Sequence, residues 1–491
     1  MHRIWFAAVL GLIGTLAAAA EEPDWAALAA QDLQAMHDAI AADHPGPVLD
    51  PAFGDRLETG LAAGLAQAPR AETLSHYLYL LVEFANALPD RHLGVWGNRD
   101  HPQWADVRRD DTLFPGFVLS WRRGGIVVAA AFDADAPPAG ARLVECDGLD
   151  ALDLARRNAL RFDGDAASQA DLVRAVPAMT VDQGQLDFLR PAQCRFALDG
   201  AERTYALAWR PVRFRALQPA LAAAAFGEAP AMGAQDLPGG VLWLSIPTLD
   251  PQGDDAAAFD AMRARLAAPQ GLARIVFDLR GNGGGSSFLA RGPPAALYGE
   301  AAVAWGERRL RTGEPDAIRA SDKVRAHFQA LRDAMGAFPS DQATASYLDA
   351  ALAAIDAAMA AGEPLARLGR RGPPADEPRP QAAFDGQVVV VVDGRAFSSA
   401  LLFVDLLRAV DDVVVVGWPT RAHGLYGEVR DMPLPSGWAS FAVSTKAFLG
   451  SAVARPTGLE PDILWDGEIA DTAGLQAFVA TLTPAGSMPA R

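Results

Sequence analysis

The sequence has few of the residues that build structural metal sites and nucleic-acid surfaces. Only two of its 491 residues are cysteines, Cys146 and Cys194, and no HExxH motif is present, so we expect no structural zinc site. Lysine is almost absent, since 43 residues are basic and two of them, Lys323 and Lys446, are lysines, which leaves 41 arginines. The formal net charge is −17. An acidic surface of this size argues against a nucleic-acid partner, because phosphate contacts need basic patches.

Long hydrophobic runs are also scarce. The first twenty residues carry Arg3, an apolar run from Ile4 to Leu16, and a tail of small residues that ends near Ala20. This order is typical of a secretory signal peptide, and the apolar run is shorter than the ~20 residues of a membrane span. No later segment is apolar enough for a span. We therefore expect residues 1–20 to be a signal peptide and the mature protein to be periplasmic or secreted.

The rest of the chain divides by pattern into three regions. Residues 21–110 have the apolar spacing of helices, and residues 111–213 contain short β-like runs separated by Gly, Asp and Pro. Both cysteines lie in the β-like region, where export permits a disulfide that their spacing does not demand. Residues 214–491 show an α/β pattern, which an Ala-rich helical insertion at 286–380 interrupts. We expect the sheet to resume at Gln387 and to continue through residues 439–448.

The clearest structural signal runs from Gln387 to Gly424. Five valines, Val388 to Val392, are long enough for a strand buried on both faces and too short for a helix. After Gly394 the apolar residues take helical spacing, and a second valine run, Val413 to Val416, follows. The pattern predicts a strand, a turn, a helix and a strand within a parallel sheet.

Two serines, Ser398 and Ser399, fall where this helix is expected to begin. A serine at that position can simply cap the helix by accepting a hydrogen bond from a free amide. It can also be a nucleophile, whose developing oxyanion meets the same amides and the positive end of the helix dipole. Taken alone, the position favours the cap.

A glycine-rich loop follows the predicted strand at 273–279. Its sequence, RGNGGGSS, completes neither a GxxxxGK[ST] phosphate loop nor a GxGxxG dinucleotide loop, so we expect no nucleotide and no other cofactor. Glycines also let a backbone approach a substrate carbonyl and direct amides at it. An oxyanion loop is therefore the third interpretation, with Asp278 and Arg280 pairing to hold it in place.

Together these motifs resemble the C-terminal processing (tail-specific) serine protease family, including its tricorn core protease branch. The resemblance covers about residues 240–465 well and most of the remaining mature chain weakly. Its motifs follow the family's order: FDLRGNGGG (277–285), VVVVVDGRAFSSA (388–400), GWPTRAHGLYGEV (417–429), LPSG (434–437), STKAF (444–448) and GLEPDI (458–463).

The resemblance implies a fold and a set of site residues. The fold would be a crotonase-like spiral αβ core (214–491) with a helical N-terminal domain (21–110) and a PDZ-like β-rich domain (111–213). The position that matches the family nucleophile is Ser398. The oxyanion donors would be the backbone amide of Ser399 and one from the glycine loop, with Gly283 or Gly284 as candidates.

The sequence departs from the family at the general base. Processing proteases place a lysine 25 residues after the serine, and here that position is His423. In the tricorn branch the base is a histidine that follows the helical region, and His92 matches it, although the family serine before it is Arg91 here. Histidine titrates in the range that a serine hydroxyl needs. His92 is the favoured base and His423 the alternative; either could instead be a loop histidine with a structural hydrogen bond.

The orienting acid of a triad is less defined, because the tricorn-type glutamate has no counterpart just ahead of GLEPD. Glu460, Asp462 and Asp405 are the candidates. The leading hypothesis is an exported serine peptidase that acts on peptide or protein substrates through an acyl-enzyme on Ser398. A serine esterase, or a non-catalytic protein that binds a peptide or another ligand on the same fold, is the alternative. The sequence leaves the oligomeric state undetermined.

Overall fold

The valine-rich stretch forms the centre of a six-stranded, mostly parallel sheet. In the computed structural model, which describes residues 22–107, 109–311, 314–335, 342–369, 377–378, 380, 384–451 and 454–482, every residue of strand β15 (Gln387–Val392) is buried. The strand order is β10-β11-β12-β15-β16-β19. Only β10 (Gly233–Leu237) runs antiparallel to its neighbour. The other strands are β11 (Val241–Ser245), β12 (Arg274–Asp278), β16 (Val413–Gly417) and β19 (Ile463–Leu464).

Both faces of this sheet are covered, as continuous valine runs predict. On β15, Val388, Val390 and Val392 belong to one apolar cluster, and Val389 and Val391 belong to another, because side chains alternate along a strand. The first cluster includes residues of α8 (Asp254–Leu266), α9 (Ser287–Tyr298), α10 (Glu300–Arg309) and α13 (Ser399–Val410); the second includes residues of α14 (Thr472–Ala480). The predicted strand–turn–helix–strand unit is therefore confirmed as β15–α13–β16.

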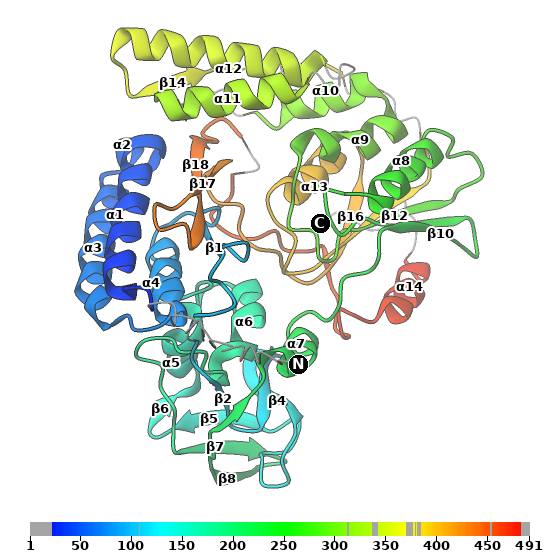
Figure 1. Cartoon of the computed structure of the whole chain (residues 1–491). Coiled ribbons are helices and arrows are strands. Elements are labelled where there is room, and N and C mark those ends of the chain that lie inside the picture. The colour runs from blue at the N-terminus through cyan, green and yellow to red at the C-terminus, as the bar shows by residue number, and fades with distance from the viewer. Residues whose placement is uncertain are drawn as a thin grey trace, which may run out of the picture.

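A second, antiparallel sheet stands beside the helical N-terminal region, as Figure 1 shows. It contains β1 (Gly94–Gly97), β13 (Asp316–Arg319), β14 (Leu365–Leu368), β17 (Tyr426–Pro433) and β18 (Ala439–Ala447). Its core is shared with α1 (Trp25–Asp43), α3 (Pro51–Gln67) and α4 (Leu74–Asn86), while α2 (Gly46–Leu49) and a short 3₁₀ turn at Ala68–Arg70 link these helices.

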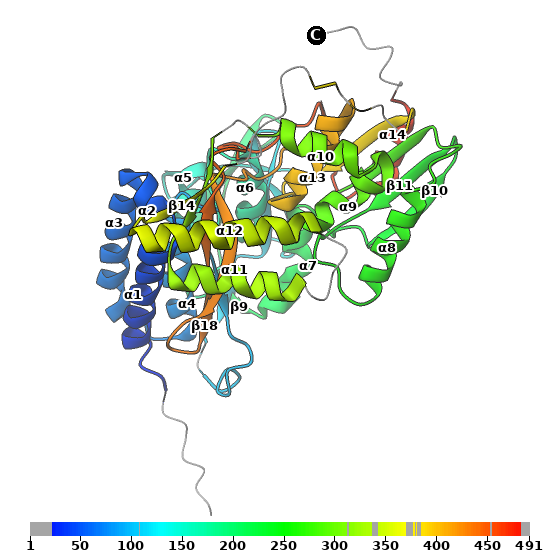
Figure 2. The same cartoon turned by 90° about the horizontal axis from the view of Figure 1, so that it is seen from above.

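The expectation that residues 439–448 continue the parallel sheet is wrong. Strand β18 pairs antiparallel with β1, β13 and β17. The segment expected as an insertion supplies β13 and β14 to this same sheet, and its helices α11 (Asp322–Ala334) and α12 (Gln342–Ala361) lie side by side on them (Figure 2). Alternating apolar residues fit either kind of strand, so periodicity alone could not assign β18 to a sheet.

The β-rich region is a separate antiparallel sheet with short helices against it. Its strands are β3 (Phe117–Arg122), β4 (Gly125–Ala131), β5 (Arg142–Cys146), β6 (Leu149–Asp150), β7 (Gln193–Leu198) and β8 (Ala201–Ala206). The short helices are α5 (Ala151–Ala155), α6 (Gln169–Ala175) and two irregular turns at Arg156–Leu160 and Val176–Thr180, and β2 (Thr112–Phe114) pairs with β9 (Arg210–Val212) ahead of α7 (Phe214–Ala224). Cys146 and Cys194 lie opposite each other on β5 and β7 and form a disulfide.

The described residues can be searched for a membrane span and for a metal site. None of their helices is long and apolar enough to cross a bilayer, and none of their His, Cys, Asp and Glu side chains gather in a group that could hold a metal ion. The predicted signal peptide, residues 1–20, lies outside the described residues.

Candidate active site

Ser398 lies in the sharp turn between β15 and α13. Its backbone has φ 54° and ψ −124°, a conformation that non-glycine residues rarely adopt and that costs of order 1–3 kcal/mol. Such turns lift a serine hydroxyl from the end of a strand onto the start of a helix. Ser398 occupies the N-cap position of α13, yet its side chain makes no capping hydrogen bond there. The hydroxyl is therefore not used as a helix cap.

The hydroxyl of Ser398 contacts a histidine instead. Its Oγ lies 3.2 Å from Nε2 of His92, which is within hydrogen-bonding distance. His92 comes from the turn between α4 and β1, so the two side chains belong to turns beside different sheets. The His92 ring packs against Phe397, with centroids 4.5 Å apart. Neighbouring packing of this kind limits the positions that the imidazole can take.

Asp90 lies behind His92, and sequence reasoning missed it. Its Oδ1 accepts a hydrogen bond of 2.9 Å from the backbone amide of His92 and lies 3.6 Å from His92 Nδ1. Burial alone would raise the pKa of Asp90, but its contacts with His44 and His92 hold that pKa well below the ordinary value. Asp90 is therefore a buried carboxylate in its charged form. The spacing of two residues in LPDRH was the available signal.

His423, the alternative base, is close but differently engaged. Its ring centroid is 5.3 Å from that of His92, and its Nδ1 lies 3.0 Å from the carbonyl oxygen of Gly424. A carbonyl can only accept, so Nδ1 carries the proton. Burial, followed by the charge that His92 can carry, lowers the pKa of His423 to about 4. His423 is therefore a weak base and stays neutral near pH 7.

The glycine loop lies against the start of α13. Strands β12 and β15 are parallel neighbours, so the loops that follow them leave the sheet at the same edge. The Ser399 hydroxyl donates a 2.8 Å hydrogen bond to the Gly285 carbonyl, which ties the helix start to the loop. The predicted pair of Asp278 and Arg280 is confirmed: both are buried, with a closest approach of 2.6 Å.

Two backbone amides remain as candidate oxyanion donors. The Ser399 amide belongs to the first turn of α13, where N–H groups have no partner within the helix. Of the two glycines named from the sequence, Gly284 donates its amide to Oδ1 of Asn282 at 2.9 Å. A Cβ built on Gly283 would meet nothing within 4 Å, so this glycine borders open space. The geometry favours Gly283 over Gly284.

The carboxylates named from the sequence lie elsewhere. Glu460 is exposed, and Asp462 pairs with Arg408 at 2.7 Å. Asp405 pairs with Arg455, and burial raises the pKa of Asp405.

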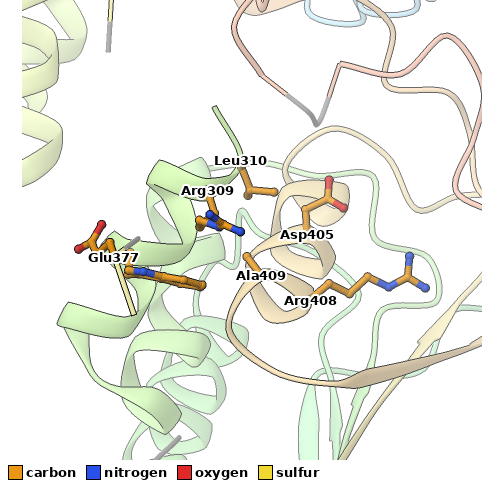
Figure 3. A pocket seen from close by; sticks show the side chains of 7 residues that line it. Arg309, Leu310, Glu377, Asp405, Arg408 and Ala409 are labelled. Carbon is orange, nitrogen blue, oxygen red and sulfur yellow. The ribbon is translucent and has the colours of Figure 1, made fainter. Parts of the chain in front are cut away.

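Asp405 also lines a pocket of about 600 Å³ between α10 and α13. The lining of this pocket includes neither Ser398 nor His92. Figure 3 shows that the Arg408 side chain extends away from Arg309 there. Within the described part of the chain, Asp90 is the one carboxylate in ion-pair distance of His92.

Arg91, which precedes His92, has partners of its own. Its guanidinium donates to Oδ1 of Asn86 at 3.2 Å and lies 3.7 Å from a carboxylate oxygen of Asp171 on α6. Arg421, two residues before His423, approaches the same carboxylate at 3.8 Å. The segments that carry the two histidines are thus both linked to the β-rich region through Asp171.

The chain matches no family model and no curated protein. Among solved structures, mature CPAF matches with a TM-score of 0.55 and 15% identity, over 89% of this chain and 92% of that chain. CPAF complexed with lactacystin matches with a TM-score of 0.54 and 15% identity, over 89% of this chain and 93% of that chain. The tricorn protease matches more weakly, with a TM-score of 0.37 and 12% identity, over 90% of this chain and 34% of that chain. These neighbours are serine proteases of the tail-specific type, and at 15% identity the chain shares with CPAF a fold that spans nearly its whole length.

Proposed function

We propose that this protein is an exported serine peptidase that cleaves peptide bonds through an acyl-enzyme on Ser398, with His92 as the general base. One observation carries the proposal: the 3.2 Å separation of Ser398 Oγ and His92 Nε2 at the start of a helix. A nucleophile within hydrogen-bonding distance of a base is the arrangement that activates a serine hydroxyl. The fold shared with CPAF supports the same reading.

In the first step, Ser398 attacks the substrate carbonyl carbon while its hydroxyl proton passes to His92 Nε2. The carbonyl oxygen becomes an oxyanion, which the amides of Ser399 and Gly283 stabilise together with the positive end of the α13 dipole. Removing one such donor in a serine protease costs roughly 10²–10³-fold in kcat. His92 then gives the proton to the leaving amine, and the C–N bond breaks.

In the second step, water attacks the acyl-enzyme. His92 takes a proton from that water, the tetrahedral intermediate collapses, and the proton returns to Ser398 Oγ as the acid product leaves. Neither step requires a metal ion or an organic cofactor. His423 is the weaker candidate for this work, because burial lowers its pKa to about 4 and its proton-bearing Nδ1 faces the Gly424 carbonyl.

Fluorophosphonate labelling tests the proposal. The wild type should react covalently, and Ser398→Ala should lose the reaction while keeping its circular dichroism spectrum and melting temperature. Ser399→Ala is the matched control, because its hydroxyl is bonded to the Gly285 carbonyl and it should still be labelled. If labelling were lost in Ser399→Ala alone, the nucleophile would be Ser399 and not Ser398. A wild type that binds a peptide but is never labelled would instead be a non-catalytic binding protein.

A peptide substrate distinguishes a peptidase from an esterase that uses the same serine. The wild type should hydrolyse both an unfolded protein and an activated ester, and Ser398→Ala should hydrolyse neither. Hydrolysis of the ester alone would identify the protein as an esterase.

A further inference from the structure

Asp90 belongs to a buried polar network. Besides its contact with His92, its Oδ2 lies 3.1 Å from Nε2 of His44 and accepts a 2.6 Å hydrogen bond from the hydroxyl of Ser444 on β18. The side chains of Asp90 and His44 are 1% and 0% exposed. A carboxylate without water is stable only when its oxygens are hydrogen-bonded. The two oxygens of Asp90 have different partners. Oδ2 contacts His44 and Ser444, and Oδ1 contacts His92.

The tautomer of His44 follows from its neighbours. The backbone amide of Gly46 donates to Nδ1 of His44 at 2.8 Å, so Nδ1 is an acceptor without a proton. The proton of neutral His44 is therefore on Nε2, which points at Asp90 Oδ2. The ring is held between Phe53 and Tyr426, with centroid distances of 4.6 and 4.5 Å. His44 is thus a fixed neutral donor.

Unlike Nδ1 of His44, Nδ1 of His92 must carry a proton if His92 is the base. It is buried and has no hydrogen-bond partner, and Asp90 Oδ1 is 3.6 Å away. For Nε2 to accept the Ser398 proton, the ring's own proton must be on Nδ1. Catalytic hydrogen bonds are often long in the absence of substrate and shorten in the complex. A small movement of the ring would therefore pair Nδ1–H with Asp90.

We propose that Asp90 is the orienting carboxylate of the serine–histidine pair, and that His44 and Ser444 are positioning residues that hold Asp90 charged and aimed at His92. The proposal rests on the function proposed above for Ser398 and His92. Asp90 selects the Nδ1–H tautomer of His92 and balances the imidazolium formed during attack. It takes the role for which Glu460, Asp462 and Asp405 were considered from the sequence.

The groups that face His92 set the direction of its pH response. They are Asp90 on one side and the rings of His423 and Phe397 on the other. Asp90 is the anion among them, and an adjacent anion favours the protonated form of a histidine. Replacement of Asp90 by a neutral residue should therefore move the acid limb of the pH–rate profile to lower pH. Loss of packing alone would lower the rate without moving that limb.

The first test is the rate of Ser398 acylation by a fluorophosphonate, with the pH profile of ester hydrolysis. Asp90→Asn should slow acylation by about 10⁴-fold, as the equivalent Asp→Asn change does in a serine triad, and should move the acid limb to lower pH. Asp38→Asn is the matched control, because Asp38 also contacts a histidine, His37, at an exposed site on α1. Wild-type rates in Asp90→Asn, or the loss appearing in Glu460→Gln instead, would overturn the proposal.

A second pair of variants decides the matter even if Asp90→Asn does not fold. His44→Phe keeps a ring between Phe53 and Tyr426 but removes the donor to Asp90, whereas His44→Gln keeps an N–H donor. We expect His44→Phe to slow acylation at least 10-fold and His44→Gln to restore most of the rate. Equal rates in these two variants would contradict the role of His44. A wild type that is never labelled would refute the proposed function itself, a separate result.

Discussion

The rings of His92 and His423 lie 5.3 Å apart at an interplanar angle of 63°, one facing Ser398 and the other facing the Gly424 carbonyl. A proton on His92 disfavours a second proton on His423, because like charges repel. His423 is the ring held neutral, with a pKa of about 4. His92 is therefore placed to act as the base, whereas His423 is placed to make a structural hydrogen bond.

The first prediction distinguishes the two histidines by the kinetics of their alanine variants. His92→Ala should reduce kcat/KM by at least about 10³-fold, since the serine loses its base. His423→Ala should retain the acid limb of the wild-type profile of kcat/KM against pH, measured on an ester substrate. A wild-type limb near pH 4 that disappears only in His423→Ala would show that His423 is the base.

The second prediction concerns stability against pH. The pKa of His423 is about 4 in the folded protein and 6.5 ordinarily, so between these values the unfolded chain binds a proton that the folded chain excludes. Stability is therefore lost as the pH falls from about 6.5 to 4, by about 3 kcal/mol in total. The His423 ring lies 5.4 Å from the ring of Phe448, centroid to centroid. His423→Phe keeps a ring there and should remove this contribution.

Urea unfolding at pH 7 and pH 4 measures the contribution of His423 to the pH dependence of stability. The difference in free energy of unfolding between the wild type and His423→Phe should change by about 3 kcal/mol between the two pH values, in favour of the variant at pH 4. A difference that does not vary with pH would contradict the depressed pKa.

The third prediction concerns the glycine loop. A Cβ on Gly284 would lie 2.8 Å from the Ser398 Cβ and 3.1 Å from the Ser399 amide nitrogen, at a residue with φ 101°. Gly284→Ala should therefore lower the free energy of unfolding by about 1–3 kcal/mol and slow labelling of Ser398. Gly283→Ala, whose Cβ would meet no atom, should unfold within about 1 kcal/mol of the wild type. Equal destabilisation of both variants would argue against the close approach.

The fourth prediction concerns the disulfide. The bond joins residues 48 positions apart in the β-rich region. A Cys146→Ser/Cys194→Ser variant should lose about 4 kcal/mol of stability, because its unfolded chain regains the entropy that the cross-link removes. Labelling of Ser398 at 25 °C should persist, since both cysteines belong to the apolar core of the β-rich region, whereas Ser398 stands at the start of α13. Free thiols in the purified wild type, detected by alkylation and mass spectrometry, would contradict the bond.

The local parts of the fold could be predicted from the sequence. The unit β15–α13–β16 followed from valine runs and helical spacing, and the pair of Asp278 and Arg280 followed from their separation of two residues. These signals are local, because strand and helix periods are properties of neighbouring residues. The assignment of β18 to a sheet was not local, and that expectation was wrong.

The network around the candidate base could not be predicted in the same way. His44, Asp90 and Ser444 lie on three segments, and the contact of Ser444 with Asp90 joins residues 354 positions apart. His44 stands before a proline, which gives a sufficient local reason for a turn. Its pairing with Asp90 exists only after the helical region packs on the antiparallel sheet.

Peptide mapping by mass spectrometry after fluorophosphonate treatment is the most direct measurement. We predict one adduct, on Ser398, that forms in the wild type and in His423→Ala and is absent from Ser398→Ala and His92→Ala. An adduct on any other residue, or an unmodified Ser398 in an active wild type, would contradict the pairing of this serine with His92.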